Sequence, residues 1–217
     1  MKPAALLLIT ALAGSGSAHA TNLLTNGSFE DPNIVATNNY ALFGTGSTAI
    51  TGWTVVGADT QLTPDTYIGL LASDGRQWID LTGIYGYDKG VRSDAVATTI
   101  GQTYNLTFAL GNYVPFGTSS LSVSINGGPA TIFTNVVDGV GPMDWESESL
   151  TWVADAASAQ ITFLGVANGA LSNNGGIGLD NVGFGAAPVP EPETYALLLA
   201  GLGAVGVAVR RQKRKVA

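Results

Sequence analysis

Apolar and polar residues alternate along much of the chain between residues 21 and 187. Over 104–110 and 121–125 every second residue is apolar, and most of the residues between them are Ser, Thr or Asn. Because successive side chains of a strand point to opposite faces, this alternation predicts two strands that each bury one face. Asn126-Gly127, which follows the second run, is typical of a type I′ hairpin turn and predicts a partner strand at 130–134.

Shorter runs of the same kind extend the pattern over the rest of this region. They predict strands at 22–29, 52–56, 76–81, 96–100, 149–153, 159–164 and 177–184. No segment repeats apolar residues with a convincing 3.6-residue period, so we expect no helix there. Roughly nine or ten strands, separated by Gly-, Asn- and Ser-rich turns, predict an all-β domain built as an antiparallel β-sandwich.

The last predicted strand changes its pattern midway. Ile177 and Leu179 have one parity, whereas Val182 and Phe184 have the other. A regular strand cannot bury both pairs on the same face, so the sequence predicts a bulge or kink near Asp180-Asn181.

The N-terminus has the features of a secretory signal peptide. Lys2 precedes an apolar stretch at 4–12, and small residues then lead to an Ala-x-Ala cleavage site ending at Ala20. We therefore expect residues 1–20 to be removed, the mature chain to begin at Thr21, and residues 21–187 to form a single domain.

The C-terminus predicts a short transmembrane helix. The fifteen residues 195–209 carry no charge, and as a helix they would span roughly 22 Å, less than the bilayer core of about 30 Å. Long basic side chains after the helix can reach the headgroups, and they place that end in the cytoplasm and the domain outside it. These basic residues are Arg210, Arg211, Lys213, Arg214 and Lys215.

Residues 188–217 combine a Pro190-Glu191-Pro192 motif, the apolar segment and the basic tail, in that order. This arrangement resembles the PEP-CTERM sorting signal of exopolysaccharide-producing Gram-negative bacteria. The resemblance implies that the chain is held in the inner membrane until an exosortase, a transpeptidase-like enzyme, cleaves near the motif. The product would then reach the cell surface or the extracellular matrix. A plain stop-transfer anchor is the alternative.

The composition of the domain excludes several kinds of chemistry. The chain has no cysteine, and its one histidine, His19, lies in the signal peptide. Zinc sites built on His or Cys, nucleophile systems that use these residues, and disulfides are therefore excluded. Residues 21–187 contain fourteen acidic and three basic residues, a formal charge of −11. Such a surface repels nucleic acid, and it suits either solubility or the binding of calcium outside the cell.

Several short motifs in the domain occur in a familiar order. They are Asn26-Gly27-Ser28-Phe29-Glu30, Ile50-Thr51-Gly52-Trp53, Trp78 to Gly83, Gly101-Gln102-Thr103-Tyr104 and Leu179-Asp180-Asn181-Val182. Together they resemble the galactose-binding-like jelly roll, a fold shared by many carbohydrate-binding modules. In those modules a structural calcium often joins a glutamate of the first strand to an aspartate of the last. The resemblance thus implies Ca²⁺ at Glu30 and Asp180; ordinary surface or turn carboxylates are the alternative.

Sugar binding requires exposed aromatic faces with polar groups beside them, because pyranose rings stack on aromatic rings. Two Gly- and Pro-containing turns, 83–88 and 111–117, supply candidates for both roles. The candidate ligand-binding residues are the rings of Tyr85, Tyr87, Tyr113 and Phe116, with Asp88 and Asn112 as polar partners. We expect Trp53, Trp78 and Trp152, which lie in predicted strands, in the core. The position of Trp145 remains open.

Three functions are compatible with this sequence. The first is non-catalytic binding of an extracellular polysaccharide, and the second is a purely structural role in the matrix or biofilm. The third is glycoside hydrolysis, which needs only two suitably placed carboxylates. Asp144, Glu146 and Glu148 form the densest acidic cluster, but like charges so close together are more typical of a solvated edge, and no catalytic motif surrounds them. We therefore expect a protein that is not an enzyme.

Overall fold

The computed structural model describes residues 21–83, 89–113, 118–136, 143–166, 176–188, 200–202 and 205. Thr21–Ala187 form one compact unit, and Met1–Ala20 with Pro188–Ala217 form a second. In the second unit, residues 200–202 and 205 are helical. The predicted signal peptide, the Pro190-Glu191-Pro192 motif, the basic tail and the rest of the predicted helix 195–209 lie outside the described residues. No helix within the described ranges is long and apolar enough to cross a membrane.

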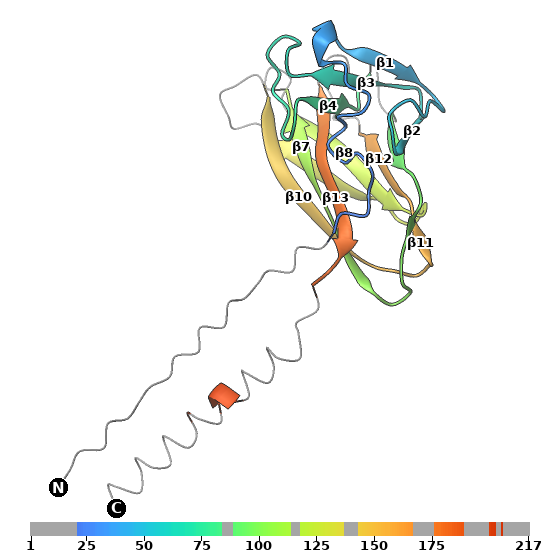
Figure 1. The fold of residues 1–217 in the computed structure, drawn as a ribbon, viewed down its shortest axis with the longest axis vertical. Helices are drawn as coiled ribbons and strands as arrows, with labels where there is room; N and C mark the ends of the chain where they lie inside the picture. Colours follow the sequence, from blue (N-terminus) through green and yellow to red (C-terminus); the bar gives the residue numbers. More distant parts are fainter. Residues whose placement is uncertain are drawn as a thin grey trace, which may run out of the picture. The chain divides into compact units, whose positions relative to one another are not determined.

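The described part of the domain is an antiparallel β-sandwich, as predicted (Figure 1). The six-stranded sheet has the order β1 (Ala41–Gly44), β3 (Asp59–Pro64), β4 (Gln77–Asp80), β13 (Ile177–Ala186), β7 (Thr103–Asn112) and β10 (Asp144–Val153). The five-stranded sheet has the order β2 (Trp53–Val56), β5 (Gly90–Ser93), β12 (Ile161–Gly165), β8 (Thr118–Ile125) and β9 (Thr131–Val136). A small pair, β6 (Val96–Ala97) with β11 (Ser158–Ala159), and the 3-10 turn η1 (Val35–Thr37) complete the described elements.

The core lies between the two sheets. Its fully buried side chains come from both of them, as Leu110 of β7 and Leu121 of β8 illustrate. Phe108 meets Phe163 edge-on, with 5.2 Å between the ring centroids. Each fully buried Leu or Phe contributes roughly 1.5–3 kcal/mol, so this core stabilises a domain that has no disulfide to support it.

Two local predictions of backbone geometry are confirmed. Asn126 and Gly127 both have positive φ, 53° and 70°, as a type I′ turn requires, and they join β8 to β9. In β13 the register against β7 shifts between Asp180 and Gly183, and Asn181 adopts a φ of 49°. The bulge expected from the change of parity is therefore present.

The predicted strand at 22–29 is wrong. This segment is irregular and is held on β13 by the side chain of Asn22 and by two backbone hydrogen bonds, from the amide of Leu23 to the carbonyl of Phe184 and from the amide of Val182 to the carbonyl of Gly27, both 2.8 Å. Asn22 donates from Nδ2 to the carbonyl of Val182 (3.0 Å) and accepts at Oδ1 from the amide of Phe184 (2.9 Å). Because backbone pairing with β13 is limited to these two bonds and the side chain of Asn22 makes the others, alternation of apolar residues does not produce a strand here.

Three strands, β1, β3 and β5, were not predicted. β1 (ALFG) is apolar but only four residues long, whereas β3 (DTQLTP) and β5 (GVRS) are short and largely polar. In β3 the buried residues include Thr60 and Thr63, exposed by 0% and 3%. A buried threonine in a strand gives no apolar signal, so alternation could not identify these strands.

The three tryptophans expected in the core have different environments. Trp53 is buried between the sheets and stacks obliquely on Phe29 at 5.0 Å. Trp152 is only partly buried and packs against the core beside Tyr104. Trp78 is fully buried, as predicted, but it is not part of the core cluster between the sheets and lies on the outer face of the six-stranded sheet.

Candidate functional site

Four strand-to-strand connections leave the sandwich at the same end. They join β4 to β5, β7 to β8, β9 to β10 and β12 to β13. The strand ends meet there: Asn112, the last residue of β7, pairs with Asp144 of β10 and with Ile177 of β13. The predicted ligand residues Tyr85, Tyr87, Asp88 and Phe116 belong to two of these connections and lie outside the described residues.

Asn112, predicted as a polar partner for a ligand, is directed into the protein instead. Its side chain is fully buried, donates to the carbonyl of Asn135 at 3.0 Å and accepts from Ser119 Oγ at 3.1 Å. These bonds tie β7 to the strands of the opposite sheet. A side chain without exposed surface does not contact a polymer in this conformation.

A half-buried indole lies across the six-stranded sheet near this end. Trp145 of β10 is opposite Gly111 of β7, which is opposite Gly178 of β13. A Cβ added to Gly111 would come within 2.7 Å of the Trp145 ring, and one added to Gly178 would also come within 2.7 Å of it. The two glycines therefore leave the space in which the ring lies flat on the outer face.

Trp78 of β4 continues this surface on the other side of the glycines. Its ring meets Trp145 edge-on, with 5.9 Å between centroids. Trp78 Nε1 donates to the carbonyl of Leu70 (3.2 Å), and Trp145 Nε1 donates to that of Leu71 (2.9 Å). The two indoles thus hold the β3–β4 loop along the outer face and fix their own orientation at the same time.

Asp80 and Tyr113 lie beside the indoles. A Cβ built on Gly176 would be 3.5 Å from Asp80 Oδ2, 3.5 Å from Tyr113 Cβ and 3.7 Å from Trp78 Cη2, so the three side chains converge there. Asp80 Oδ1 accepts from the amide of Thr82 at 2.8 Å. Burial raises the pKa of Asp80 to about 6, although the bonds from Thr82 and the attraction of Lys89 oppose this rise.

We call Trp78, Trp145, Tyr113 and Asp80 the aromatic platform. Tyr113 was predicted as a ligand residue, and the structure places it, half-buried, in this group. Trp145 was left open and Asp80 was missed. The feature that could identify this site is the strand register, which sets Trp145 opposite Gly111 and Gly111 opposite Gly178. Strand register cannot be read from one sequence.

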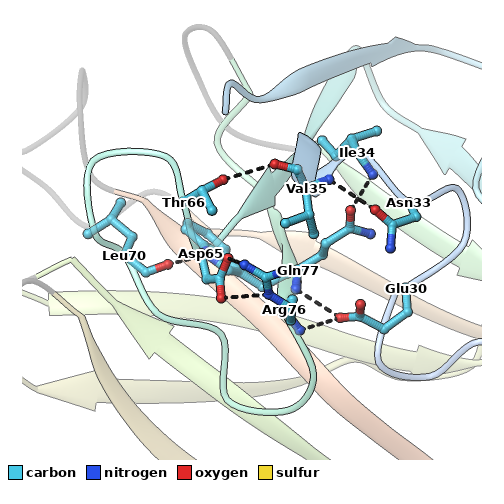
Figure 2. Close-up of polar contacts among 10 residues, drawn as sticks. Glu30, Asn33, Ile34, Val35, Asp65, Thr66, Leu70, Arg76 and Gln77 are labelled. Carbon is cyan, nitrogen blue, oxygen red and sulfur yellow. Dashed lines mark hydrogen bonds and ion pairs between the residues drawn. The ribbon is translucent and has the colours of Figure 1, made fainter. Parts of the chain in front are cut away.

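Glu30 and Asp180, the predicted calcium ligands, hold the same loop. Glu30 Oε1 accepts from the amides of Arg76 (2.6 Å) and Gln77 (2.8 Å), as Figure 2 shows. Asp180 Oδ2 accepts from the amides of Ser73 and Asp74, both at 2.8 Å. The two carboxylates therefore accept hydrogen bonds from the two ends of the five-residue segment 73–77.

The buried side chain of Gln77 organises the chain around Glu30. Its Nε2 donates to the carbonyls of Phe29 (2.9 Å) and Pro32 (3.0 Å), and its Oε1 accepts from the amide of Ile34 at 2.5 Å (Figure 2). By contrast, Arg76 extends outward to an ion pair with Asp65 at 3.2 Å.

The two carboxylates offer hard oxygen atoms that suit a calcium ion. Among the described residues, no hydrogen bond uses Glu30 Oε2, and no cationic side chain pairs with the fully buried Asp180. Burial raises the pKa of Asp180 to about 7, and repulsion by Asp74 adds to the rise. No group of three or more His, Cys, Asp or Glu side chains suited to a metal occurs in the described ranges, so a cation would need backbone oxygens as well.

The acidic cluster of β10 lies on an edge strand. Asp144, Glu146 and Glu148 occupy alternate positions of β10, which is the outermost strand of its sheet. Burial, with repulsion by Glu146, raises the pKa of Glu148. Charges along an exposed strand edge oppose pairing with another sheet, which is a structural role for this cluster.

Comparison with known proteins supports the fold and the sorting signal. Residues 188–214 match the PEP-CTERM protein-sorting motif, which confirms that prediction. The K1 cleaved adhesin domain of Lys-gingipain from Porphyromonas gingivalis W83 has a similar structure, with a TM-score of 0.50 and 12% identity over 69% of this chain and 99% of that one. A family 61 carbohydrate-binding module in complex with β-1,4-galactotriose has a TM-score of 0.46 and 16% identity over 77% of this chain and 100% of that one.

The sequence also matches a much larger protein. Halomucin of Haloquadratum walsbyi (strain DSM 16790 / HBSQ001) is 31% identical over 186 residues, which cover 82% of this chain and 2% of that protein. The chain thus spans about 2% of the length of this relative. Residues 22–178 match the family described as "Protein of unknown function (DUF642)", and the chain belongs to that family.

Proposed function

We propose that this exported protein is sorted by an exosortase-type enzyme and that its domain binds extracellular carbohydrate without modifying it. The PEP-CTERM motif supports export to the cell surface. The observation that carries the binding proposal is the aromatic platform, which combines two partly exposed rings with a carboxyl group at the loop end of the sandwich.

The platform has the chemistry that sugar recognition needs. The faces of aromatic rings bind the apolar C–H faces of pyranoses, and a small number of placed polar groups read the hydroxyls. Trp145 and Tyr113 provide the rings, while Asp80 and Thr82 provide oxygen atoms. Because Trp145 is fixed by its bond to Leu71, little side-chain entropy is lost when a sugar stacks on it.

The predicted loop residues follow platform residues in the sequence. Tyr85, Tyr87 and Asp88 follow Thr82 in the chain, and Phe116 follows Tyr113. We propose that they contact the same ligand as the platform, which would give a polysaccharide several adjacent subsites.

The variant Tyr113→Ala tests this site. With oligosaccharides from the native exopolysaccharide, titration should show affinity reduced by about tenfold or more, equivalent to about 1.4 kcal/mol. Tyr40→Ala, which alters a half-buried tyrosine of another surface pair with Tyr67, serves as the matched control and should bind normally. Equal affinity of both variants and the wild type would contradict the assignment.

We also propose a structural Ca²⁺ held by Glu30 and Asp180. The support is the buried, cation-free carboxylate of Asp180 and the unused oxygen of Glu30. Bound Ca²⁺ would neutralise the charge and fasten the N-terminal segment to β13. Titration of the metal-free protein should raise its melting temperature and release heat, and Asp180→Asn should abolish both effects. An unchanged melting temperature and no heat would exclude the ion.

One observation favours a structural role in the matrix instead. β9 is an edge strand without a charged residue, and its Ile132 and Val136 are 61% and 66% exposed. Such an edge can pair with another strand. If the protein self-associates and Ile132→Lys prevents it, while no glycan binds, the structural function is the better account.

A further inference from the structure

The single lysine of the domain is buried against an aspartate. Lys89 is 6% exposed and directly precedes β5. Its carbonyl accepts from the amide of Gly165 at 2.9 Å, which fixes the residue against β12. The Nζ atom contacts Asp59 Oδ1 and is the only ammonium group in residues 21–187. The lysine of a surface ion pair remains solvated, whereas Lys89 in this pair is almost fully shielded from water.

Asp59 is held just as firmly, but by the other sheet. It is the first residue of β3 and pairs with Gly44 of β1. Its carboxyl group lies against Gly83, where an added Cβ would be 2.5 Å from Oδ1 and 3.0 Å from Cγ. Gly83 has a φ of 55°, and its carbonyl accepts from Gln61 Nε2 at 2.5 Å. The side chain of Asp59 is 24% exposed, so the carboxyl is mostly shielded from water.

A second carboxyl group lies on the same face of the sheet as Asp59. Asp80 of β4 pairs with Gln61 of β3, so the two side chains share a sheet face, and Asp59 is two residues from Gln61 on that face. The charge of Lys89 acts on Asp80, whose carboxyl is held by Thr82. A lysine, an aspartate and a neighbouring acid are thus grouped near the start of β3, the end of β4 and the start of β5.

We propose that Lys89 and Asp59 form an intramolecular isopeptide bond that joins the two sheets. Transfer of a proton from the ammonium to the carboxylate gives a neutral amine and a carboxylic acid. Nζ attacks Cγ, the C–O bond to the departing hydroxyl breaks, and Nζ–Cγ forms. The amine loses a second proton, the hydroxyl gains one, and one water leaves. Asp80 relays this proton. The condensation changes no oxidation state, so no oxidant or redox cofactor is required.

The isopeptide bond would give the domain a covalent cross-link, which it cannot obtain from disulfides. The chain has no cysteine and therefore no disulfide, although exported domains commonly rely on such cross-links. An amide between β3 and the start of β5 would link the six-stranded sheet to the five-stranded sheet. It would also close the loop 59–89 and reduce the entropy of the unfolded chain, as other cross-links do.

Mass spectrometry of the intact exported protein tests the proposal. Loss of water lowers the mass of the wild type by about 18 Da, and Lys89→Arg alone adds about 28 Da, so the two proteins should differ by about 46 Da. This difference is independent of where the termini are processed. A difference of about 28 Da would overturn the proposal.

A tryptic map of the denatured wild type decides the same question without a variant. The isopeptide bond blocks cleavage after Lys89 and joins the fragment that ends at Arg76 to residues 77–92. Free fragments with cleavage after Lys89 would overturn the proposal. Asp80→Asn should leave a measurable uncrosslinked fraction, whereas Asp65→Asn, at the ion pair with Arg76, should crosslink completely. Equal crosslinking of the two variants would overturn the role of Asp80.

Discussion

Gln77 donates a hydrogen bond from its buried side-chain amide to the carbonyl of Phe29, at 2.9 Å. The same nitrogen reaches Pro32, and Oε1 receives the amide of Ile34. One side chain of β4 therefore satisfies three backbone groups of the irregular N-terminal segment. The bond to Phe29 is buried and the other two are partly buried, so the protein supplies hydrogen bonds that water cannot fully replace.

Replacing Gln77 should destabilise the domain strongly. Gln77→Leu keeps the volume but leaves two carbonyls and one amide without their partner, which we expect to cost about 3 kcal/mol in the free energy of unfolding. Urea denaturation measures this change. Gln102→Leu, which removes one half-buried bond to Thr103, should cost less than about 1 kcal/mol. Similar losses in the two variants would contradict the role given to Gln77.

Glu30 should matter more for stability than the neighbouring ion pair. Glu30→Ala leaves the amides of Arg76 and Gln77 without their acceptor, and we expect a loss of about 2 kcal/mol in metal-free buffer. Arg76→Ala removes only the surface pair with Asp65 and keeps the backbone amide, so it should cost less than about 1 kcal/mol. Thermal denaturation of both variants with chelator present compares them. A larger loss in Arg76→Ala would refute this ranking.

Asp80 should make the domain more stable at mildly acidic pH. Its pKa is about 6 in the folded protein against 3.8 in the reference state, so folding favours the protonated carboxyl. The contribution of this group therefore improves as the pH falls through about 6, by up to about 3 kcal/mol below about pH 4. Asp80→Asn keeps the acceptor for Thr82 but cannot titrate, so unfolding measured from about pH 8 to about pH 5 should show a flatter dependence. Asp65→Asn is the control and should keep the pH dependence of the wild type. If Asp80→Asn also keeps that dependence, the burial of Asp80 does not cause it.

Enlarging Gly178 should disturb the aromatic platform. A Cβ at Gly178 would lie 2.4 Å from Met143 and 2.7 Å from Trp145, so Gly178→Ala must displace that ring. We expect a shift in tryptophan fluorescence and about tenfold weaker carbohydrate binding, or about 1.4 kcal/mol. Gly44→Ala, where no atom lies within 4 Å of the added Cβ, should change neither property. If the fluorescence of Gly178→Ala shifts but the variant binds carbohydrate normally, the ring of Trp145 does not contact the ligand.

The sequence predicts the architecture well wherever the pattern is amphipathic. The strands near Leu106 and Val123, the Asn126-Gly127 turn and the bulge at Asp180 each have a local cause that is visible in a few residues. The predicted strand at 22–29 is wrong because only two backbone hydrogen bonds join this segment to β13, and the side chain of Asn22 makes the other bonds.

The site is less predictable because it depends on contacts between distant strands. Asn112 looks like a loop residue, but pairing with β10 and β13 buries it. Trp145 becomes part of a surface only because Gly111 and Gly178 lie beside it. Glu30 and Asp180 were brought together by family resemblance, and the loop that both of them hold through its amides has no sequence signal of its own.

Binding of the purified exported protein to native exopolysaccharide and to a glycan array, with Ca²⁺ and with chelator, tests the central claim most directly. Our account predicts saturable binding to a defined sugar, weakened in Tyr113→Ala and retained in Tyr40→Ala. A folded protein that binds neither the polymer nor any glycan under both conditions would contradict it.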